Sequence, residues 1–354
     1  MPGDGMLNVR DFGAVGDGEA DDTAAIQKAI NKAARAGATV LVPAGAFRVS
    51  RLKLRSHTGL LGYPTWSYRD FGGSILRLAD AGAACLLDLT GAVGVTINGL
   101  CLDGQRLPGK THGVMFAKPN YGKQEDAPRI ERCRISGFSG DGVHLRRIWC
   151  FSVRHCMLSH NGGHGLYVRG WDGFILDNWL SGNAGAGYAA PDENSSITMT
   201  ANRIEWNQAG GIVVNDGHLY NITGNYIDRS GGPGIRLTGG RHFTIFGNVI
   251  YRSGRPDWRD LAEYEDSHVW FEGVVSLTFS GNTMRVARDD GDTGNFSPRY
   301  GVVYHRLENS LIKNNTMQDG ALEKLFVDLH DNRANVIIAD NVGSLFVPPK
   351  DKNP

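Results

Sequence analysis

The feature that most constrains this chain is a short phrase that recurs along its middle. Each copy opens with glycine and continues with alternating apolar residues. The copies begin, at steps of 23, 22, 24 and 23 residues, at Gly142, Gly165, Gly187, Gly211 and Gly234. A second phrase keeps the same spacing and begins at Cys133, Cys156, Asn178, Asn202, Asn225 and Asn248. Two phrases with one period predict a stacked repeat fold, in which no single repeat buries its apolar face alone.

Composition narrows the choice of partners. The chain has 354 residues, of which 41% are hydrophobic, and this content suffices for one elongated domain with a substantial core. Lys+Arg and Asp+Glu number 37 each and the pI is about 7.2, so no net field attracts nucleic acid or a membrane surface. We therefore expect neither partner, and we expect any ligand to be recognised locally.

The start of the chain and its cysteines indicate neither an export signal nor a disulfide framework. No apolar segment typical of a signal peptide follows Met1, and no stretch approaches a membrane-spanning length, so we expect no export signal in this chain. Five cysteines without tight spacing argue against a disulfide framework. Cys133 and Cys156 stand in the asparagine position of the repeat, where we expect buried free thiols.

One amphipathic helix precedes the repeats. Asp21 or Asp22 can cap its start, and Gly37 is placed to end it. Its apolar stripe comprises Ala25, Ile26, Ala29, Ile30 and Ala33. Such a helix suits the open end of a stack of strands, which would otherwise expose core and unpaired backbone.

The segments NVRDFGAVGDG, DDTAAIQKAI and VLVPAGAFRVS resemble the opening of the pectate-lyase-like superfamily of right-handed parallel β-helices. That superfamily includes bacterial polysaccharide hydrolases, lyases and epimerases, and many phage tailspikes. The resemblance implies an all-β right-handed parallel β-helix with an N-terminal capping α-helix. It implies a cap over residues 1–50, a β-helix over 51–346 and a tail over 347–354. It also implies a secreted, phage or cell-surface setting, and a homotrimer as one expected assembly.

Loop lengths suggest where a binding face lies. From Asn248 to Asn282 is 34 residues and from Asn282 to Asn315 is 33, so each of these coils carries an insertion. The insertions, 252–267 and 285–300, precede a main strand, as does the loop 104–112. Three long loops at one corner of the coil are expected to stand beside one face of the stack and to border it as raised sides. An aromatic loop at 63–68 falls among the first, shorter coils.

Strand alternation assigns the two faces of the main phrase. Residues one and three after the glycine are expected to point inward: Val143, Leu145, Leu166, Val168, Ile212, Val214, Ile235, Leu237, Val269 and Phe271. Residues two after it are expected to point outward: His144, Tyr167, Ala189, Val213, Arg236, Trp270 and Val303. Each such set forms a row of outward side chains along the stack, which we call a lane. The second outward lane, four residues after the glycine, comprises Arg146, Arg169, Pro191, Asn215, Thr238, Glu272 and His305. The asparagines from Asn178 to Asn341 are expected to form a structural ladder.

Carboxylates at the end of this strand suggest a glycoside hydrolase or a related transglycosylase. Asp192 and Asp216 fall five after the glycine in consecutive coils, and coils about 4.8 Å apart would give the spacing of a retaining pair, about 5–5.5 Å. Glu272 lies two coils beyond Asp216, close to the range of about 6.5–9.5 Å of an inverting pair. We predict Asp216 as nucleophile or base and Glu272 or Asp192 as acid, with Glu193 beside them.

The outward lanes suggest how a long glycan would be held. Arginines at 146, 169 and 236 would bind hydroxyl or carboxylate groups, and aromatic rings would stack on sugars. The predicted binding residues are His144, Arg146, Tyr167, Arg169, Asn215, Arg236, Trp270 and His305, with Trp258 and Tyr264 as further stacking residues.

Two other functions stay open. A lyase on an acidic polysaccharide would use His144 and Tyr167 as base and acid, with arginines neutralising the uronate, and Ca²⁺ as its cofactor if it needs one. A tailspike or adhesin would bind glycan without turnover.

No cofactor is expected for a hydrolase, and no cluster of residues has the spacing of a zinc site. Asp289, Asp290 and Asp292 are interpreted as a turn rather than a calcium site. Gly163-His164-Gly165 resembles a polygalacturonase segment, but the preceding coil offers only Asp141.

Overall fold

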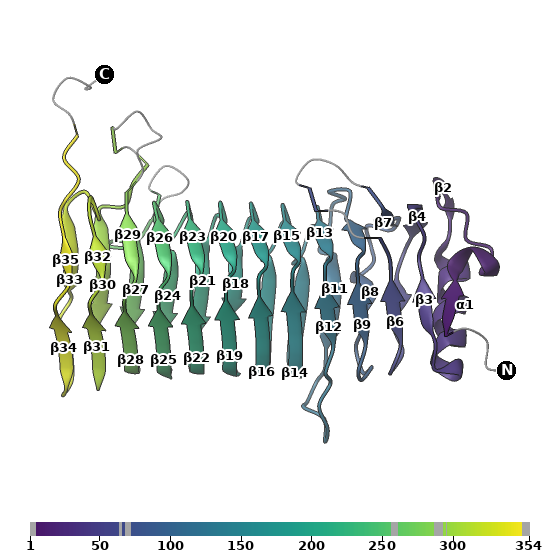
Figure 1. Ribbon diagram of the computed structural model, residues 1–354, viewed down its shortest axis with the longest axis horizontal. Helices are drawn as coiled ribbons and strands as arrows, with labels where there is room; N and C mark the ends of the chain where they lie inside the picture. The colour runs from purple at the N-terminus through teal and green to yellow at the C-terminus, as the bar shows by residue number, and fades with distance from the viewer. Residues whose placement is uncertain are drawn as a thin grey trace. The chain divides into compact units, whose positions relative to one another are not determined.

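The computed structural model describes residues 5–63, 66–67, 72–255, 261–286, 293–294 and 296–348. The chain divides into two compact units, Met1–Trp179 and Leu180–Pro354. Each is a stack of short parallel strands (Figure 1). Trp258 and the Asp289 run lie outside the described residues, as do parts of the insertions 252–267 and 285–300. Among the described residues, no helix combines the length and the apolarity needed to span a membrane.

The described part of the first unit forms three faces of parallel strands. The first face comprises β5 (Leu52–Lys53), β8 (Cys85–Asp88), β11 (His112–Ala117) and the starts of the long strands β14 (Val143–Arg154) and β16 (Leu166–Leu176). The second comprises β1 (Met6–Asn8), β3 (Thr39–Leu41), β6 (Gly59–Leu61), β9 (Thr96–Asn98), β12 (Arg129–Glu131) and the ends of β14 and β16. The third comprises β2 (Asp17–Asp21), β4 (Gly45–Val49), β7 (Ser74–Leu78), β10 (Cys101–Asp103), β13 (Arg134–Ser136) and β15 (Met157–Ser159). Strand β17 (Trp179–Ser181) begins at the last residue of this unit.

The second unit repeats the same three-sided coil over its described residues. Its first face comprises β18 (Ala186–Ala190), β21 (Gly210–Asn215), β24 (Ile235–Thr238), β27 (Ser267–Glu272), β30 (Tyr300–His305) and β33 (Lys324–Asp328). The second comprises β19 (Asn194–Thr200), β22 (Gly217–Thr223), β25 (Arg241–Phe246), β28 (Val275–Ser280), β31 (Ser310–Lys313) and β34 (Val336–Ala339). The third comprises β20 (Arg203–Glu205), β23 (Tyr226–Asp228), β26 (Val249–Tyr251), β29 (Thr283–Arg285), β32 (Thr316–Met317) and β35 (Val342–Gly343).

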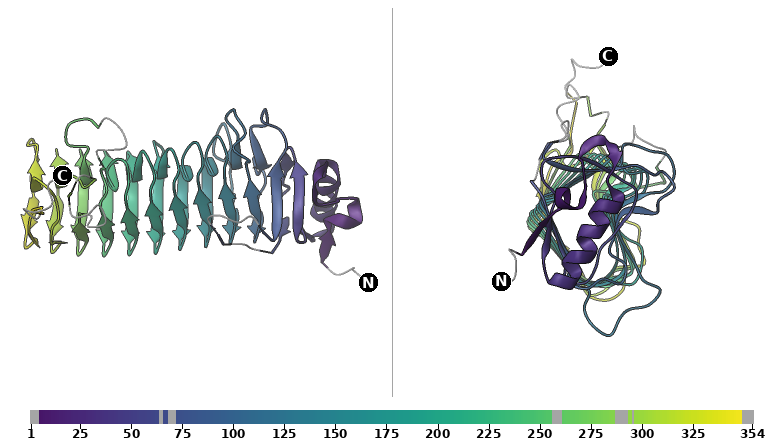
Figure 2. Two further views of the ribbon diagram at one scale, coloured as in Figure 1. Left: turned by 90° about the horizontal axis from the view of Figure 1, so that it is seen from above. Right: turned by 90° about the vertical axis from the view of Figure 1, so that its right-hand side faces the viewer.

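Helix α1 (Thr23–Ala36) lies across the N-terminal end of the first unit, after the short 3-10 helix η1 (Val9–Phe12) (Figure 2). Ile26 and Ile30 are fully buried, and Gly37 ends the helix with φ +64°. The cap differs in detail from the expectation. Asp21 accepts the backbone N–H of Thr23, whereas the carboxylate of Asp22 accepts backbone N–H groups of Val15 and Gly16. The expected capping helix is confirmed.

The predicted inward residues form the core of each unit. All ten are fully buried, because alternate side chains of a strand point to opposite faces. The asparagine ladder is also confirmed in the second unit. Each side-chain oxygen accepts the backbone and side-chain N–H groups of the asparagine one coil earlier, as between Asn248 and Asn225. The ladder therefore satisfies buried polar groups at a turn, and it is structural.

Candidate functional site

A groove of about 830 Å³ lies on the first face of the second unit. It is lined by Pro191, Val213, Asn215, Asp216, Arg236, Thr238, Gly239, Glu272, Gly273 and Arg306. The structure thus brings together four of the predicted site residues of this unit, namely Asn215, Asp216, Arg236 and Glu272. Asp192, Glu193, Trp270 and His305 do not line this groove.

Left-handed corner residues shape the groove. Asp216, Gly239, Gly273 and Arg306 occupy this corner in consecutive coils, with φ of 47°, 72°, 65° and 52°. A Cβ at Gly239 would lie 2.2 Å from Oδ1 of Asp216, so only glycine lets this carboxylate rest against the next coil. Arg306 donates to Glu272 at 2.6 Å, and Arg236 pairs with Glu265. The groove therefore offers one carboxylate at a corner and a second that is already ion-paired.

The expected alignment of Asp192 with Asp216 is not the one in the structure. Ala190 pairs with Val214, but Asn194 pairs with Gly217, so the turn between them holds one residue more in the earlier coil. Glu193, with φ 45°, takes the left-handed corner that corresponds to Asp216. The acidic pair at equivalent corners is therefore Glu193 and Asp216, because the extra residue shifts the register after the strand.

Trp270 lies partly buried against an apolar cluster. It packs, together with Tyr264, against buried Tyr300, Val303 and Val327. Val303 is fully buried and Ala189 is 6% exposed, so these two members of the predicted outward lane are covered. Trp270 and Tyr264 are themselves only partly buried, so stacking of these two rings on sugars stays a prediction.

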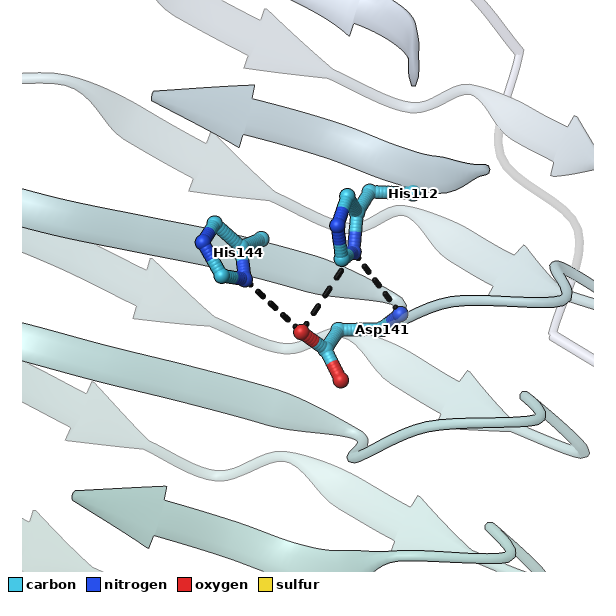
Figure 3. A group of neighbouring side chains, drawn as sticks. All are labelled: His112, Asp141 and His144. Carbon is cyan, nitrogen blue, oxygen red and sulfur yellow. Dashed lines mark hydrogen bonds and ion pairs between the residues drawn. The ribbon is translucent and has the colours of Figure 1, made fainter. Parts of the chain in front are cut away.

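A second polar group lies in the first unit, where β11 and β14 begin (Figure 3). The backbone N–H of Asp141 donates to Nδ1 of His112 at 2.9 Å. The carboxylate Oδ2 of Asp141 lies 2.8 Å from Nδ1 of His144, while Oδ1 of Asp141 accepts the backbone N–H of His164 at 2.7 Å. A Cβ at Gly163 would stand 2.3 Å from that Oδ1, so the absence of a side chain at Gly163 makes the contact between Asp141 and the backbone of His164 possible. We call His112, Asp141 and His144 the His–Asp–His group.

Burial and hydrogen bonding determine the charges of this group. Burial raises the pKa of Asp141, but the hydrogen bonds from His144 and from the backbone of His164 outweigh it and hold that pKa below its usual value. Burial lowers the pKa of His112 to about 4, and burial also lowers the pKa of His164. At neutral pH, Asp141 is a carboxylate and accepts the proton of His144 Nδ1. With Nδ1 donating to Asp141, the neutral His144 ring has Nε2 as its proton-accepting nitrogen.

Aromatic and basic side chains adjoin His144. The rings of His144 and Tyr167 stack at 4.3 Å between centroids and 8° between planes. His144 pairs in register with Tyr167, and Arg146 pairs in register with Arg169, so the two predicted outward lanes run side by side here. Arg146 is exposed, and its guanidinium has no partner among the described residues. The predicted binding residues of the first unit therefore lie next to one another on neighbouring strands.

Sequence reasoning missed His112 and gave Asp141 only a weak role. The signal was present in two segments one coil apart, Gly140-Asp141-Gly142 and Gly163-His164-Gly165, whose glycines lack the side chains that would separate the coils.

Potential ligand atoms of the His–Asp–His group all lie within 4.8 Å of one another. Two imidazoles and a carboxylate suit a transition-metal ion. However, Nδ1 of His112 already accepts the Asp141 N–H, which is the arrangement of an oriented acid–base pair.

Comparison with family models supports the fold. The model described as "right handed beta helix region" matches residues 110–250 and 192–343. The model described as "rhamnogalacturonase A/epimerase, pectate lyase-like" matches residues 6–69, the segment that contains the capping helix.

Relatives by sequence include polysaccharide-modifying enzymes. The chain is 29% identical over 245 residues to mannuronan C5-epimerase AlgE2 of Azotobacter vinelandii, which covers 61% of this chain and 24% of that protein. It is 28% identical over 199 residues to alginate lyase 7 of the same organism, covering 50% of this chain and 22% of that protein. The chain thus spans about a quarter of the length of these relatives.

Solved structures share the architecture. The A-module of mannuronan C-5 epimerase AlgE4 of Azotobacter vinelandii has a TM-score of 0.71 at 21% identity, covering 96% of this chain and 98% of that one. The enzymatically active domain of bacteriophage CBA120 tailspike protein 2 has a TM-score of 0.73 at 16% identity, covering 88% and 48%. Likeness at these identities is likeness of fold. Together with the matched family model, it places this chain in the right-handed parallel β-helix family.

Proposed function

We propose that this protein acts on a uronate-containing polysaccharide and removes the proton at C5 of a uronate residue, leading to elimination or epimerisation. The observation that carries this proposal is the His144 imidazole, oriented by Asp141 and stacked on Tyr167. Relatives named as mannuronan C5-epimerases and an alginate lyase support the same chemical class. Removal of the C5 proton is the step that elimination and epimerisation share.

Each residue has a role in that step. Nε2 of His144 takes the C5 proton, and the guanidinium groups of Arg146 and Arg169 offset the charge that develops on the sugar carboxylate. In elimination, the electron pair forms a C4=C5 double bond as the C4–O4 bond breaks, and the Tyr167 hydroxyl protonates O4. In epimerisation, C4–O4 stays intact and C5 receives a proton from solvent water on its opposite face. Proton exchange with solvent then restores His144 and Tyr167.

The test is incubation with polymannuronate and polygalacturonate in D₂O. Elimination gives an ultraviolet-absorbing double bond, and epimerisation places deuterium at C5, which nuclear magnetic resonance detects. His144→Ala and Tyr167→Phe should each lower the rate by about 10²–10⁴-fold, the usual contribution of general acid–base catalysis. His57→Asn, at an exposed histidine of the same unit, is the matched control. Wild-type rates in both site variants would refute the assignment.

Hydrolysis is the second candidate, and the groove that holds Asp216 and Glu272 favours it. It predicts products that gain water and carry no double bond, with turnover abolished by Asp216→Asn or Glu272→Gln. Product masses therefore separate the two reactions. Binding without turnover of any tested polymer would support the third function, a non-catalytic glycan binder.

A further inference from the structure

We propose that the first unit carries a second glycan-binding cleft, separate from His144, that takes an acidic sugar residue. The cleft has a volume of about 760 Å³ and is lined by Trp66, Glu131, Arg132, Arg154, His155 and Asp177. Only the class of sugar, a uronate, rests on the proposed function. The cleft itself rests on the contacts of these six residues.

The cleft and the His–Asp–His group lie on different faces of the coil. His144 stands near the start of β14, whereas Arg154 is its last residue. Between them the chain turns at two residues in the left-handed region, Arg147 with φ 55° and Cys150 with φ 60°. Arg154 then pairs with Glu131 of β12 on the second face. A ligand in the cleft therefore contacts a surface other than the one that presents His144.

Trp66, from the aromatic loop noted in the sequence, forms a fixed and exposed wall of the cleft. Its side chain is 49% exposed. The indole Nε1–H donates to the carbonyl oxygen of His155, 89 residues away, at 3.1 Å, and its ring lies 5.6 Å from that of Trp179. An exposed aromatic ring already held in place loses little freedom on binding, and its apolar face suits a sugar ring.

The charges of the cleft leave one cation without a partner. Asp177 binds His155 at 2.7 Å, and Arg132 approaches Glu131 at 4.0 Å. Across the described residues, the guanidinium of Arg154 has no hydrogen bond or ion pair, and its Nε is buried without an acceptor. An unsatisfied guanidinium beside an indole favours a ligand that brings a carboxylate to the arginine and a ring face to the tryptophan.

The test is calorimetric titration of the full chain with tetramannuronate and tetragalacturonate, in the His144→Ala background so that the ligand is not consumed. Trp66→Ala and Arg154→Gln should each weaken binding by about tenfold, the loss expected when one central contact is removed. Trp66→Phe, which keeps an aromatic face, should restore part of the affinity. Phe174→Ala removes an aromatic side chain of similar exposure, 52%, and is the matched control. Thermal melts establish that each variant is folded.

Cellotetraose, a neutral tetrasaccharide, tests the charge assignment. It should bind more weakly than the acidic tetramers and should be insensitive to Arg154→Gln. Unchanged affinity for the acidic tetramers in both Trp66→Ala and Arg154→Gln would overturn the cleft, whatever the fate of the proposed reaction. Conversely, loss of tetramer binding in these variants would establish the cleft even if the wild-type protein turned over neither tetramer.

Discussion

At the scale of single residues, the chemistry of the first unit depends on how closely side chains approach one another. Asp141 receives the backbone N–H of His164 because Gly163 has no Cβ, and it presents its other oxygen to His144. His112, whose ring lies 4.4 Å from that of His144, uses Nδ1 to accept the backbone N–H of Asp141. His112 must therefore be neutral in the folded protein, and this requirement links stability to pH.

Replacing His112 with asparagine tests that link. The folded pKa of His112 is about 4, below its usual value of about 6.5, so the unfolded chain binds more protons between these values. Stability from this residue is fully present above pH 6.5 and is lost as pH falls toward 4. His112→Asn keeps an acceptor for the Asp141 N–H but does not titrate. Urea unfolding at pH 7 and pH 5 should show about 2 kcal/mol less pH dependence in the variant. Equal pH dependence in both proteins would contradict the assignment.

At the scale of elements, a β-helix coil is held by its strands and by the turns between them. The asparagine ladder fixes one of those turns. Asn225 is 2% exposed and bonds Asn248 and the carbonyl of Met199. A second turn, at the end of the first face, carries the left-handed corner and varies in length, as the extra residue before Asn194 shows. The ladder therefore maintains the stack, while the variable corner supplies the groove.

Removing one ladder amide tests this division. Asn225→Ala leaves buried partners in two coils unsatisfied, at about 1–3 kcal/mol for each such group, and should lower the free energy of unfolding by at least that amount. Asn221→Ala, at an exposed asparagine of the same coil, is the control. Chemical denaturation measures both. A loss in Asn225→Ala no larger than in Asn221→Ala would show that the ladder is dispensable.

At the scale of the whole molecule, no disulfide supports the fold, since all five cysteines are free thiols. Stability comes instead from the apolar interior repeated in every described coil, with a small share from surface charges that balance to zero. Homotrimer formation, which the resemblance implies, stays a prediction.

Thiol alkylation checks this account. Cys85, Cys101, Cys133 and Cys156 are buried, and only Cys150 is half-exposed. Burial raises the pKa of Cys150, so its labelling should be slow at neutral pH and faster at higher pH. Iodoacetamide should therefore modify one thiol per native chain and five per denatured chain, as counted by intact mass, and a reductant should leave the melting temperature unchanged. Rapid labelling of a second thiol would show that the first unit opens.

Local patterns alone predicted a stacked repeat fold, its N-terminal helix, its inward residues and its asparagine ladder, and the resemblance of the opening segments identified the stack as a parallel β-helix. Each pattern lies in neighbouring residues, as alternation along a strand, as the apolar stripe of a helix or as a repeated turn. Only the tertiary structure decided which outward side chains meet. His112 joins Asp141 across a coil, Trp66 reaches the backbone of His155, and Glu193 instead of Asp192 matches Asp216. Such contacts depend on turn lengths and on glycines that let coils approach, because one added residue in a turn shifts every position after it.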